Sequence, residues 1–175
     1  MPDVELYLHA LTPRVIGQRI EGVRIGNPFI VRTFDPPIAV IVGLTLNTLR
    51  RLGKRIVFGL DDGLFVIVHL MIAGRFRWRE RGAGIPGKVG LLAFDFTNGT
   101  LLLTEQGSKR HASVHVVRGE AAVAEHDPGG PEVPTTDLAG FAQRLTAENH
   151  TLKRALTDPR IFSGIGNAYS DEILH

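Results

Sequence analysis

Two glycines near the C-terminal end of the chain stand where a phosphate-binding turn would need them. Gly164 and Gly166 directly precede Asn167, and a run compatible with a helix follows. Asn is a favoured helix N-cap, and the first turn of a helix offers unpaired N–H groups and a partial positive charge. Glycines remove the side chains that would hold a ligand away from that backbone. The pattern predicts an anion cradle of the kind that grips phosphate.

The N-terminal residues could supply covalent chemistry. Removal of Met1 would leave Pro2 with a secondary amine, and an α-amino group titrates near pH ~8, so part of it is nucleophilic at neutral pH. Such an amine attacking a sugar carbon gives an iminium ion, an electron sink for expelling a base and then eliminating phosphate. Asp3 or Glu5 could move protons beside it. The alternative is structural, since proline is ordinary near a helix start.

The elements that would position these groups are mostly strands. Residues 4–11 have helical spacing and end before Thr12-Pro13, residues 20–34 read as strands, and a brief helix is expected over 38–43. Residues 44–117 read as antiparallel strands, with hairpin signals at 61–63 and 98–99 and a closing strand at 114–117. This pattern predicts an antiparallel β-sandwich with an N-terminal helix.

The remainder of the chain is expected to be helical. Residues 119–136 carry four acids, no Lys or Arg, and several Pro and Gly, which is typical of a linker. Asp137 is expected to cap a helix over 138–145, and 152–158 reads as a short helix. The predicted fold is therefore α+β: a sandwich domain (1–118), an acidic linker (119–136) and a partial helical domain (137–175). Because the chain stops within or just after the last helix, we expect a fragment or truncated form.

Composition narrows the function further. Hydrophobic residues make up 43% of the 175, enough for a core, and no apolar run approaches the ~20 residues of a membrane span. With no cysteine, disulfides and thiolate zinc sites are excluded, and no signal peptide is visible, so an intracellular protein is expected. Residues 1–118 carry a net charge of +7, with thirteen Arg among sixteen basic residues, and residues 119–175 carry −5. Together with the predicted phosphate grip, the positive charge of residues 1–118 favours a nucleic-acid-binding groove over a surface that is merely solvated.

Residues 153–174 resemble the helix–two-turns–helix element of formamidopyrimidine-DNA glycosylases and endonuclease VIII-like enzymes. Further matches occur at intervals from Pro2 to Leu174, so the resemblance covers nearly the whole chain. It implies a bifunctional DNA glycosylase/AP lyase of base-excision repair, acting on double-stranded DNA with an oxidised or ring-opened base or an abasic site. The protein is expected in the cytoplasm, associated with the nucleoid. It is expected to be a monomer and not to bind a membrane. DNA would lie between the two domains, and no cofactor is expected in this chain, because the family's zinc finger would lie beyond residue 175.

The resemblance also assigns roles in the sandwich. The segment 52–56 looks like the one that delivers a catalytic lysine, here Lys54, and its alternative is a solvated hairpin lysine. The segment 68–74 resembles the run His-Leu-Gly-Met-Ser-Gly, so His69 would contact the damaged strand. Ile72 would then be an apolar wedge that fills the void left by an everted nucleotide. Without the resemblance, both residues would be assigned to the core.

Two other matches concern DNA contacts. Residues 105–113 occupy the place of a loop with Arg-Arg-Phe-Gly, whose Arg-Phe wedge is absent here; Lys109, Arg110 and His111 are basic substitutes. In the helical grip, Lys153 and Asn167 match phosphate-binding residues, Gly164 and Gly166 precede the helix, and Tyr169 would also face the DNA backbone.

The N-terminus departs from the family pattern, which opens with Met-Pro-Glu and soon repeats Pro-Glu. If Pro2 and Asp3 match the first pair, Pro2 is the nucleophile and Asp3 replaces the usual Glu. If they match the second pair, the active terminus is absent and Glu5 would take over part of the acid's role. The first alignment implies a Schiff-base enzyme, and the second favours a catalytically silent protein that binds damaged or kinked DNA. An RNA-binding protein is a further alternative, because the helical grip occurs outside repair enzymes.

Overall fold

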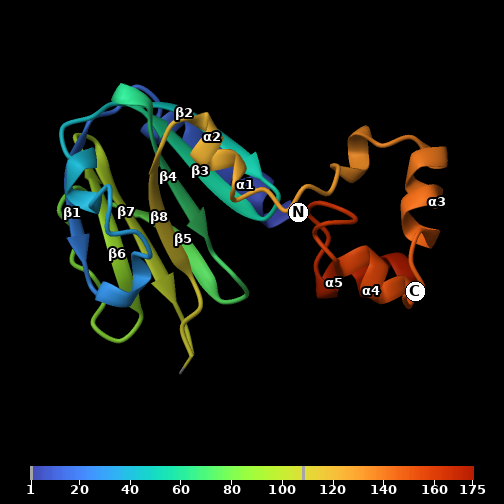
Figure 1. Ribbon diagram of the computed structural model, residues 1–175. Helices are drawn as coiled ribbons and strands as arrows, with labels where there is room; N and C mark the ends of the chain where they lie inside the picture. The colour runs from blue at the N-terminus through green and yellow to red at the C-terminus, as the bar shows by residue number, and fades with distance from the viewer. Residues whose placement is uncertain (1, 108) are drawn as a thin grey trace. The chain divides into compact units, whose positions relative to one another are not determined.

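The computed structural model describes residues 2–107 and 109–175, which fall into two compact units, Pro2–Ala124 and Glu125–His175 (Figure 1). Each unit has its own apolar core, and each is described by itself. The boundary at Ala124 lies inside the segment that the sequence assigns to the linker.

The first unit is the expected sandwich of two antiparallel sheets (Figure 1). One sheet has the order β1-β6-β7-β5 and the other β2-β3-β4-β8. The strands are β1 (Ile20–Ile25), β2 (Leu46–Leu52), β3 (Arg55–Leu60), β4 (Leu64–His69), β5 (Gly74–Arg79), β6 (Gly90–Phe96), β7 (Gly99–Glu105) and β8 (Ser113–Arg118). Short 3-10 turns occur at η1 (Pro28–Ile30), η2 (Ile38–Ile41) and η3 (Asp61–Gly63). The turn at η3 joins β3 to β4, and Thr97-Asn98 joins β6 to β7, so both predicted hairpins are present.

Aromatic side chains fill the space between the sheets. Phe58 of β3 lies between Phe76 of β5 and Phe94 of β6, with ring centroids 6.0 and 5.7 Å away. Every residue of β7 is buried, as expected for a central strand that is covered on both faces. The core therefore spans both sheets and fixes the positions of the strand ends.

Helix α1 (Pro2–Val15) covers one open side of the sandwich, between the edge strands β2 and β5. Tyr7 packs edge-on against Phe76 with centroids 5.6 Å apart. The predicted end before Thr12-Pro13 was wrong, because the helix continues through Pro13. A proline in the last turn removes only one intrahelical bond, and the complete burial of Val15 favours the extra turn.

The segment 27–33 closes the opposite side, between β6 and β8. The N–H of Asn27 donates to the carbonyl of Leu91 (3.0 Å), and that of Arg32 donates to Val114 (2.9 Å). Val31 forms a parallel bridge with Val114. This segment thus extends the second sheet beyond β8.

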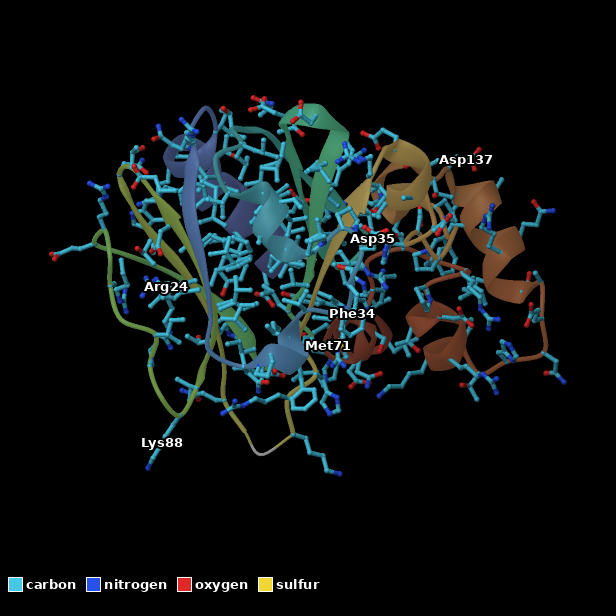
Figure 2. The ribbon with its side chains drawn as sticks, turned by 60° about the vertical axis from the view of Figure 1, so that its left-hand side comes forward. Arg24, Phe34, Asp35, Met71, Lys88 and Asp137 are labelled. Atoms are coloured by element: carbon cyan, nitrogen blue, oxygen red, sulfur yellow. The ribbon has the colours of Figure 1, made fainter. Side chains whose placement is uncertain are left out.

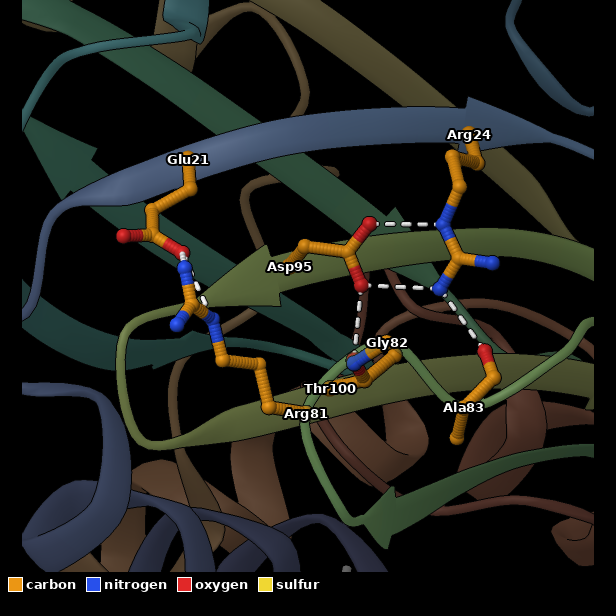
Figure 3. Close-up of polar contacts among 7 residues, drawn as sticks. All are labelled: Glu21, Arg24, Arg81, Gly82, Ala83, Asp95 and Thr100. Atoms are coloured by element: carbon orange, nitrogen blue, oxygen red, sulfur yellow. Dashed lines mark hydrogen bonds and ion pairs between the residues drawn. The ribbon is translucent and has the colours of Figure 1, made fainter.

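The connection between β5 and β6 crosses β7, because β5 and β6 flank that strand and both run antiparallel to it. Arg24 holds the crossover: its guanidinium binds the Asp95 carboxylate (2.6 and 2.8 Å) and the carbonyl of Ala83 (2.7 Å; Figure 3). The Thr100 hydroxyl donates to Asp95 (2.6 Å) and accepts from the N–H of Gly82 (3.0 Å; Figure 3). Asp95 therefore ties β1, β7 and the crossover together.

The predicted linker 119–136 differs from the structure at its start. Residues Glu120–Ala124 form helix α2, whose Val123 packs with Val57, Ile67 and Val117 of the sandwich. Tertiary burial of one valine accounts for this helix, which the Pro- and Gly-rich composition of the segment did not suggest. Farther along, the N–H of Gly130 donates to the carbonyl of Pro159 (3.1 Å), so this part of the segment packs on the second unit.

The second unit contains α3 (Leu138–Thr146), α4 (Leu152–Thr157) and α5 (Asn167–Leu174), and the 3-10 turn η4 (Val133–Thr135). Asp137 caps α3 as predicted, accepting the N–H of Gly140 (2.8 Å). The core of the second unit contains Leu156, Phe162 and Ile165, and the ring of Phe141 stacks on that of Phe162 with centroids 4.5 Å apart. Among the described residues, no helix is long and apolar enough to span a bilayer.

Candidate nucleic-acid interface

The strand register brings several predicted site residues to one end of the sandwich. In the second sheet, Arg55 of β3 faces His69 of β4, and His69 faces Ser113 of β8. In the first sheet, Gly74 at the start of β5 faces Glu105 at the end of β7. The loop 70–73 joins β4 to β5, and the loop that follows Glu105 joins β7 to β8, so both connect the two sheets at this end. This end, called the loop end below, therefore contains the β2–β3 turn, His69 and both crossing loops.

The N-terminus of α1 lies at the loop end as well. The Glu5 carboxylate accepts a hydrogen bond from Nε of Arg51, near the end of β2, at 2.5 Å. The far end of the helix lies near the start of β2, where the N–H of Gly17 donates to the carbonyl of Leu46 (2.8 Å). Pro2 and Asp3 are exposed in the first helical turn. At this position the proline nitrogen is not needed for an intrahelical bond.

Lys54 occupies the turn between β2 and β3. Gly53, with φ of +57°, adopts the left-handed conformation that this tight turn requires. Lys54 is half-buried, and burial lowers the pKa of its ammonium group from the ordinary value. It is thus not the fully solvated hairpin lysine of the alternative interpretation.

His69 ends β4 close to Lys54 and is also half-buried. Burial, followed by the charges of Arg55, Lys54 and His115, lowers the pKa of its imidazole from 6.5 to about 4. The ring is therefore neutral at physiological pH. A neutral imidazole has one N–H donor and one acceptor, which suits the polar strand contact expected of this residue.

The loop 70–73 carries an exposed apolar tip. Ile72 is 89% exposed, which excludes the core assignment, and its neighbour Met71 is 44% exposed. Two hydrogen bonds to backbone carbonyls fix the loop. The N–H of Gly74 donates to the carbonyl of Leu70 (2.9 Å), and Nη1 of Arg75 donates to the carbonyl of Ile72 (2.9 Å). Figure 2 marks Met71 on this loop. A fixed backbone with exposed apolar side chains is the form that an apolar wedge requires.

The described part of the loop between β7 and β8 (106–107 and 109–112), called the basic loop below, is held by a buried carboxylate. Glu105 is only 2% exposed and accepts the backbone N–H groups of His111 (3.0 Å) and Ala112 (3.1 Å). Lys109 and His111 are exposed, and Arg110 donates to the carbonyl of Lys88. Figure 2 shows Lys88 projecting outward from the neighbouring crossover. Glu105 thus presents basic side chains without placing its own charge at the surface.

The helix–two-turns–helix segment that the sequence predicts to grip phosphate, called the grip below, lies in the second unit with its glycine-preceded helix start. Gly164 has φ of +88°, and Gly166 has φ of −121° and ψ of 179°. Gly166 is the N-cap of α5, whereas the sequence favoured Asn167, which is the first helical residue. The N-cap residue of a helix has an extended backbone. Because Gly166 takes this conformation, Asn167 follows it with helical backbone angles. The first intrahelical bond of α5 runs from the N–H of Ser170 to the carbonyl of Gly166 (2.9 Å). The backbone N–H groups at the start of the helix, before Ser170, make no such bond and are available to an anion.

The two helices of the grip are joined by an ion pair. Lys153 Nζ of α4 lies 2.6 Å from Oδ1 of Asp171 on α5, and both side chains are about half exposed. Tyr169 is 37% exposed in the first turns of α5. The ammonium group that the resemblance assigns to phosphate therefore has an internal carboxylate partner in this structure.

The residues of the linker support the grip. Ser163 forms a parallel bridge with Glu132; its N–H donates to the carbonyl of Pro131 and its hydroxyl donates to the Glu132 carboxylate (both 2.9 Å). A Cβ on Gly130 would lie 2.4 Å from the carbonyl oxygen of Pro159, so the close approach requires glycine. Sequence reasoning missed this support, together with Arg51, Arg75 and Glu105, because each acts through a long-range contact that no local pattern signals.

The sequence matches the model of the formamidopyrimidine-DNA glycosylase N-terminal domain over residues 1–165. The chain belongs to this family. Curated formamidopyrimidine-DNA glycosylases from Sphingopyxis alaskensis and Mycoplasma genitalium are 32% and 25% identical, over 100% and 99% of the chain. The chain spans 65% and 62% of the length of these two relatives, respectively.

Solved structures of the family have the same fold. The Lactococcus lactis FPG in complex with a Fapy-dG containing DNA superimposes with a TM-score of 0.88 at 25% identity, covering 99% of this chain and 66% of that one. A complex of the same glycosylase with an abasic site containing DNA gives 0.88 at 26% identity, with 99% and 65% covered. These similarities confirm the family and the α+β fold predicted from the sequence.

Proposed function

We propose that this chain provides the catalytic and phosphate-gripping parts of a DNA glycosylase/AP lyase that removes oxidised or ring-opened bases from double-stranded DNA. The observation that carries the proposal is the gathering of Glu5, Lys54, His69 and Ile72 at the loop end. Arg51 and Arg55 lie at the same end, and phosphate neutralisation would supply most of the affinity. The relatives named above support the substrate class.

The proposed reaction begins at Pro2. After removal of Met1, its secondary amine attacks C1′ of the deoxyribose while the bond to the damaged base breaks, and the base leaves with a proton. The attacking nitrogen then loses its proton, and its lone pair opens the C1′–O4′ bond as O4′ is protonated, which leaves an iminium ion at C1′. Loss of a proton from C2′ then breaks the C3′–O bond and expels the phosphate. The positive end of α1 disfavours protonation of the amine and so favours its nucleophilic form.

Other side chains would have supporting roles. Asp3 lies next to the amine and is the nearer proton carrier, whereas Glu5 is ion-paired with Arg51 and serves mainly to fix α1. Lys54 would contact a phosphate, and its lowered pKa also allows proton transfer at the sugar. Ile72 would fill the space of the everted nucleotide, which offsets part of a stacking cost of a few kcal/mol. Lys153 and the N–H groups after Gly166 would bind the DNA backbone.

Borohydride trapping on a duplex with an abasic site tests the covalent step. The N-terminal mass is measured first, because a retained Met1 leaves no free proline amine. We expect a covalent adduct with the wild-type chain and none with Pro2→Gly, which retains only a primary amine of altered geometry. Asp127→Asn, at an exposed acid near the start of the second unit, is the matched control and should trap normally.

A second function is favoured by the engagement of Glu5 with Arg51, which removes one of the two N-terminal acids from proton transfer. In this case the chain binds damaged or kinked DNA without cleaving it. Salt-sensitive binding to the abasic duplex without any trapped adduct would support the binder and contradict the enzyme. Preference for structured RNA over abasic DNA would contradict both.

A further inference from the structure

A shallow groove lies beside the basic loop, on the side of β8 away from Lys54. It is lined by Phe29 and Ile30 of η1, by Asn27 and Arg32 on either side of that turn, and by Leu91, Arg110 and Ala112. Its floor is apolar and buried: Ile30, Leu91 and Ala112 are each at most 3% exposed. The wall is the ring of Phe29, which is 76% exposed.

The aromatic wall is held in place by local structure. The Asn27 side chain accepts the N–H of Phe29 at 3.0 Å, and Pro28 occupies the first turn of η1. On the far side of η1, the backbone of Arg32 is bonded to β8. A large apolar ring is therefore fixed in an exposed position where it adds nothing to the core. Such a ring is suited to stacking against a flat ligand.

Two guanidinium groups lie at the rim, and the lining contains no carboxylate. Arg32 is exposed, and Arg110 uses one donor on the Lys88 carbonyl and has others to offer. The charge therefore matches a phosphate on either side of a stacked base. An aromatic face with Arg groups that follow a backbone is the arrangement by which proteins hold unpaired nucleotides.

The position of the groove indicates which strand it would contact. From β3 to β4, to β8, and then to the segment at Val31 there are three inter-strand steps, or about 14 Å at ~4.8 Å per step. This separation from the Lys54 turn is comparable with the ~12 Å width of a DNA major groove. If Lys54 and His69 contact the damaged strand, the groove is placed for the opposite strand.

We propose that the groove binds one unpaired nucleotide of the strand opposite the lesion, with its base on Phe29 and its phosphates on Arg32 and Arg110. The inference rests on the proposed function and deepens it, since it names the DNA strand that this groove would contact. The basic loop carries no aromatic residue within 105–107 or 109–113. Phe29 would supply the stacking surface from a neighbouring element.

The test uses the full chain and a duplex with a tetrahydrofuran abasic analogue opposite 2-aminopurine. Binding is followed by anisotropy, and stacking of the unpaired base by its fluorescence. We expect Phe29→Ala to weaken binding about 5- to 150-fold, the range for loss of one stacked base, and to abolish the fluorescence change. Arg32→Ala should lower the salt slope by about one. Phe34→Ala and Arg77→Ala remove exposed side chains outside the groove and serve as matched controls.

Three results would overturn the inference while leaving the proposed function intact: unchanged binding by Phe29→Ala, an equal loss by Phe34→Ala, or an equal loss on an undamaged duplex. Failure of the wild-type chain to prefer the abasic duplex would instead contradict the proposed function. Because Phe29 is exposed, its substitution is expected to leave the thermal melt unchanged, which is checked by circular dichroism.

Discussion

Lys153 and Asp171 form an ion pair of 2.6 Å that joins the two helices of the phosphate grip. Both side chains are about half exposed, so the pair contributes less than about 1 kcal/mol to stability. Its larger consequence concerns binding: a phosphate at the start of α5 has to share the ammonium group with Asp171 or displace it.

Asp171→Asn should therefore tighten DNA binding with little change in stability. The substitution frees Lys153 and removes a negative charge near the phosphate, so we expect a gain of about 3- to 10-fold at low salt. Lys153→Met should weaken binding on all DNA sequences and reduce the salt slope by about one. Glu172→Gln removes a neighbouring acid of the same helix and is the control. An equal gain from both acid variants would show that only net charge matters.

His69 should make the folded state sensitive to mild acid. Its pKa is about 4 in the native protein and about 6.5 when unfolded, so between these values the unfolded chain binds the proton and the native chain does not. Stability is therefore lost as the pH falls from about 6.5 towards 4. The loss attributable to His69 is about 2 kcal/mol by pH ~5, as an upper estimate.

Urea unfolding of wild type and His69→Gln at pH ~7 and ~5 measures this contribution. The difference between the two proteins should shift by that amount in favour of the variant at the lower pH. His9→Gln, at an exposed position of α1, controls for the loss of a histidine. A pH-independent difference between wild type and His69→Gln would contradict the prediction.

Local patterns were sufficient for much of the fold. Turn residues at 61–63 and 98–99 located both hairpins, Asp137 located the start of α3, and Asp158 the end of α4. In each case the signal and the structure involve residues within a few positions of each other. The start of α5 was displaced by one residue, because either Gly166 or Asn167 can cap a helix and only the backbone angles distinguish them.

Features that depend on distant contacts were not predictable from the sequence. Helix α2 forms because Val123 finds an apolar site on the sandwich, and the order β6-β7-β5 depends on pairing across a long crossover. The same applies to the site: the resemblance identified Lys54 and Ile72, but their shared position at the loop end follows only from the strand register. Glu105, an acid in an otherwise basic region, acts entirely through its burial.

Asp95→Asn should destabilise the sandwich unit. The hydrogen bond from Arg24 is the main cause that lowers the Asp95 pKa, with a further contribution from Thr100. Because the native pKa is depressed, this stabilisation is present above pH ~3.8 and is lost as the pH falls through the native value. Loss of the charge at neutral pH should cost about 1–2 kcal/mol, an amount reduced by the partial exposure of Arg24.

Thermal melts at neutral pH compare Asp95→Asn with Glu21→Gln. Glu21 pairs with Arg81 on the same crossover, but the Arg81 side chain is 65% exposed, so its variant should lose less than about 1 kcal/mol. Equal melting temperatures for the two variants would show that the network in Figure 3 is no more stabilising than a surface pair.

The backbone at Met71 should destabilise the folded protein relative to one with glycine at this position. Its φ of +55° lies in the left-handed region, which costs a residue with a Cβ about 1 kcal/mol or more. Met71→Ala retains this cost and loses the side chain, whereas Met71→Gly loses both, so the glycine variant should be more stable than the alanine variant by about 1 kcal/mol. Ala73→Gly, in the same loop but without a positive φ, should instead be neutral or destabilising. Urea unfolding of the three variants decides the point, and an alanine variant as stable as the glycine variant would show that the backbone at Met71 is not strained.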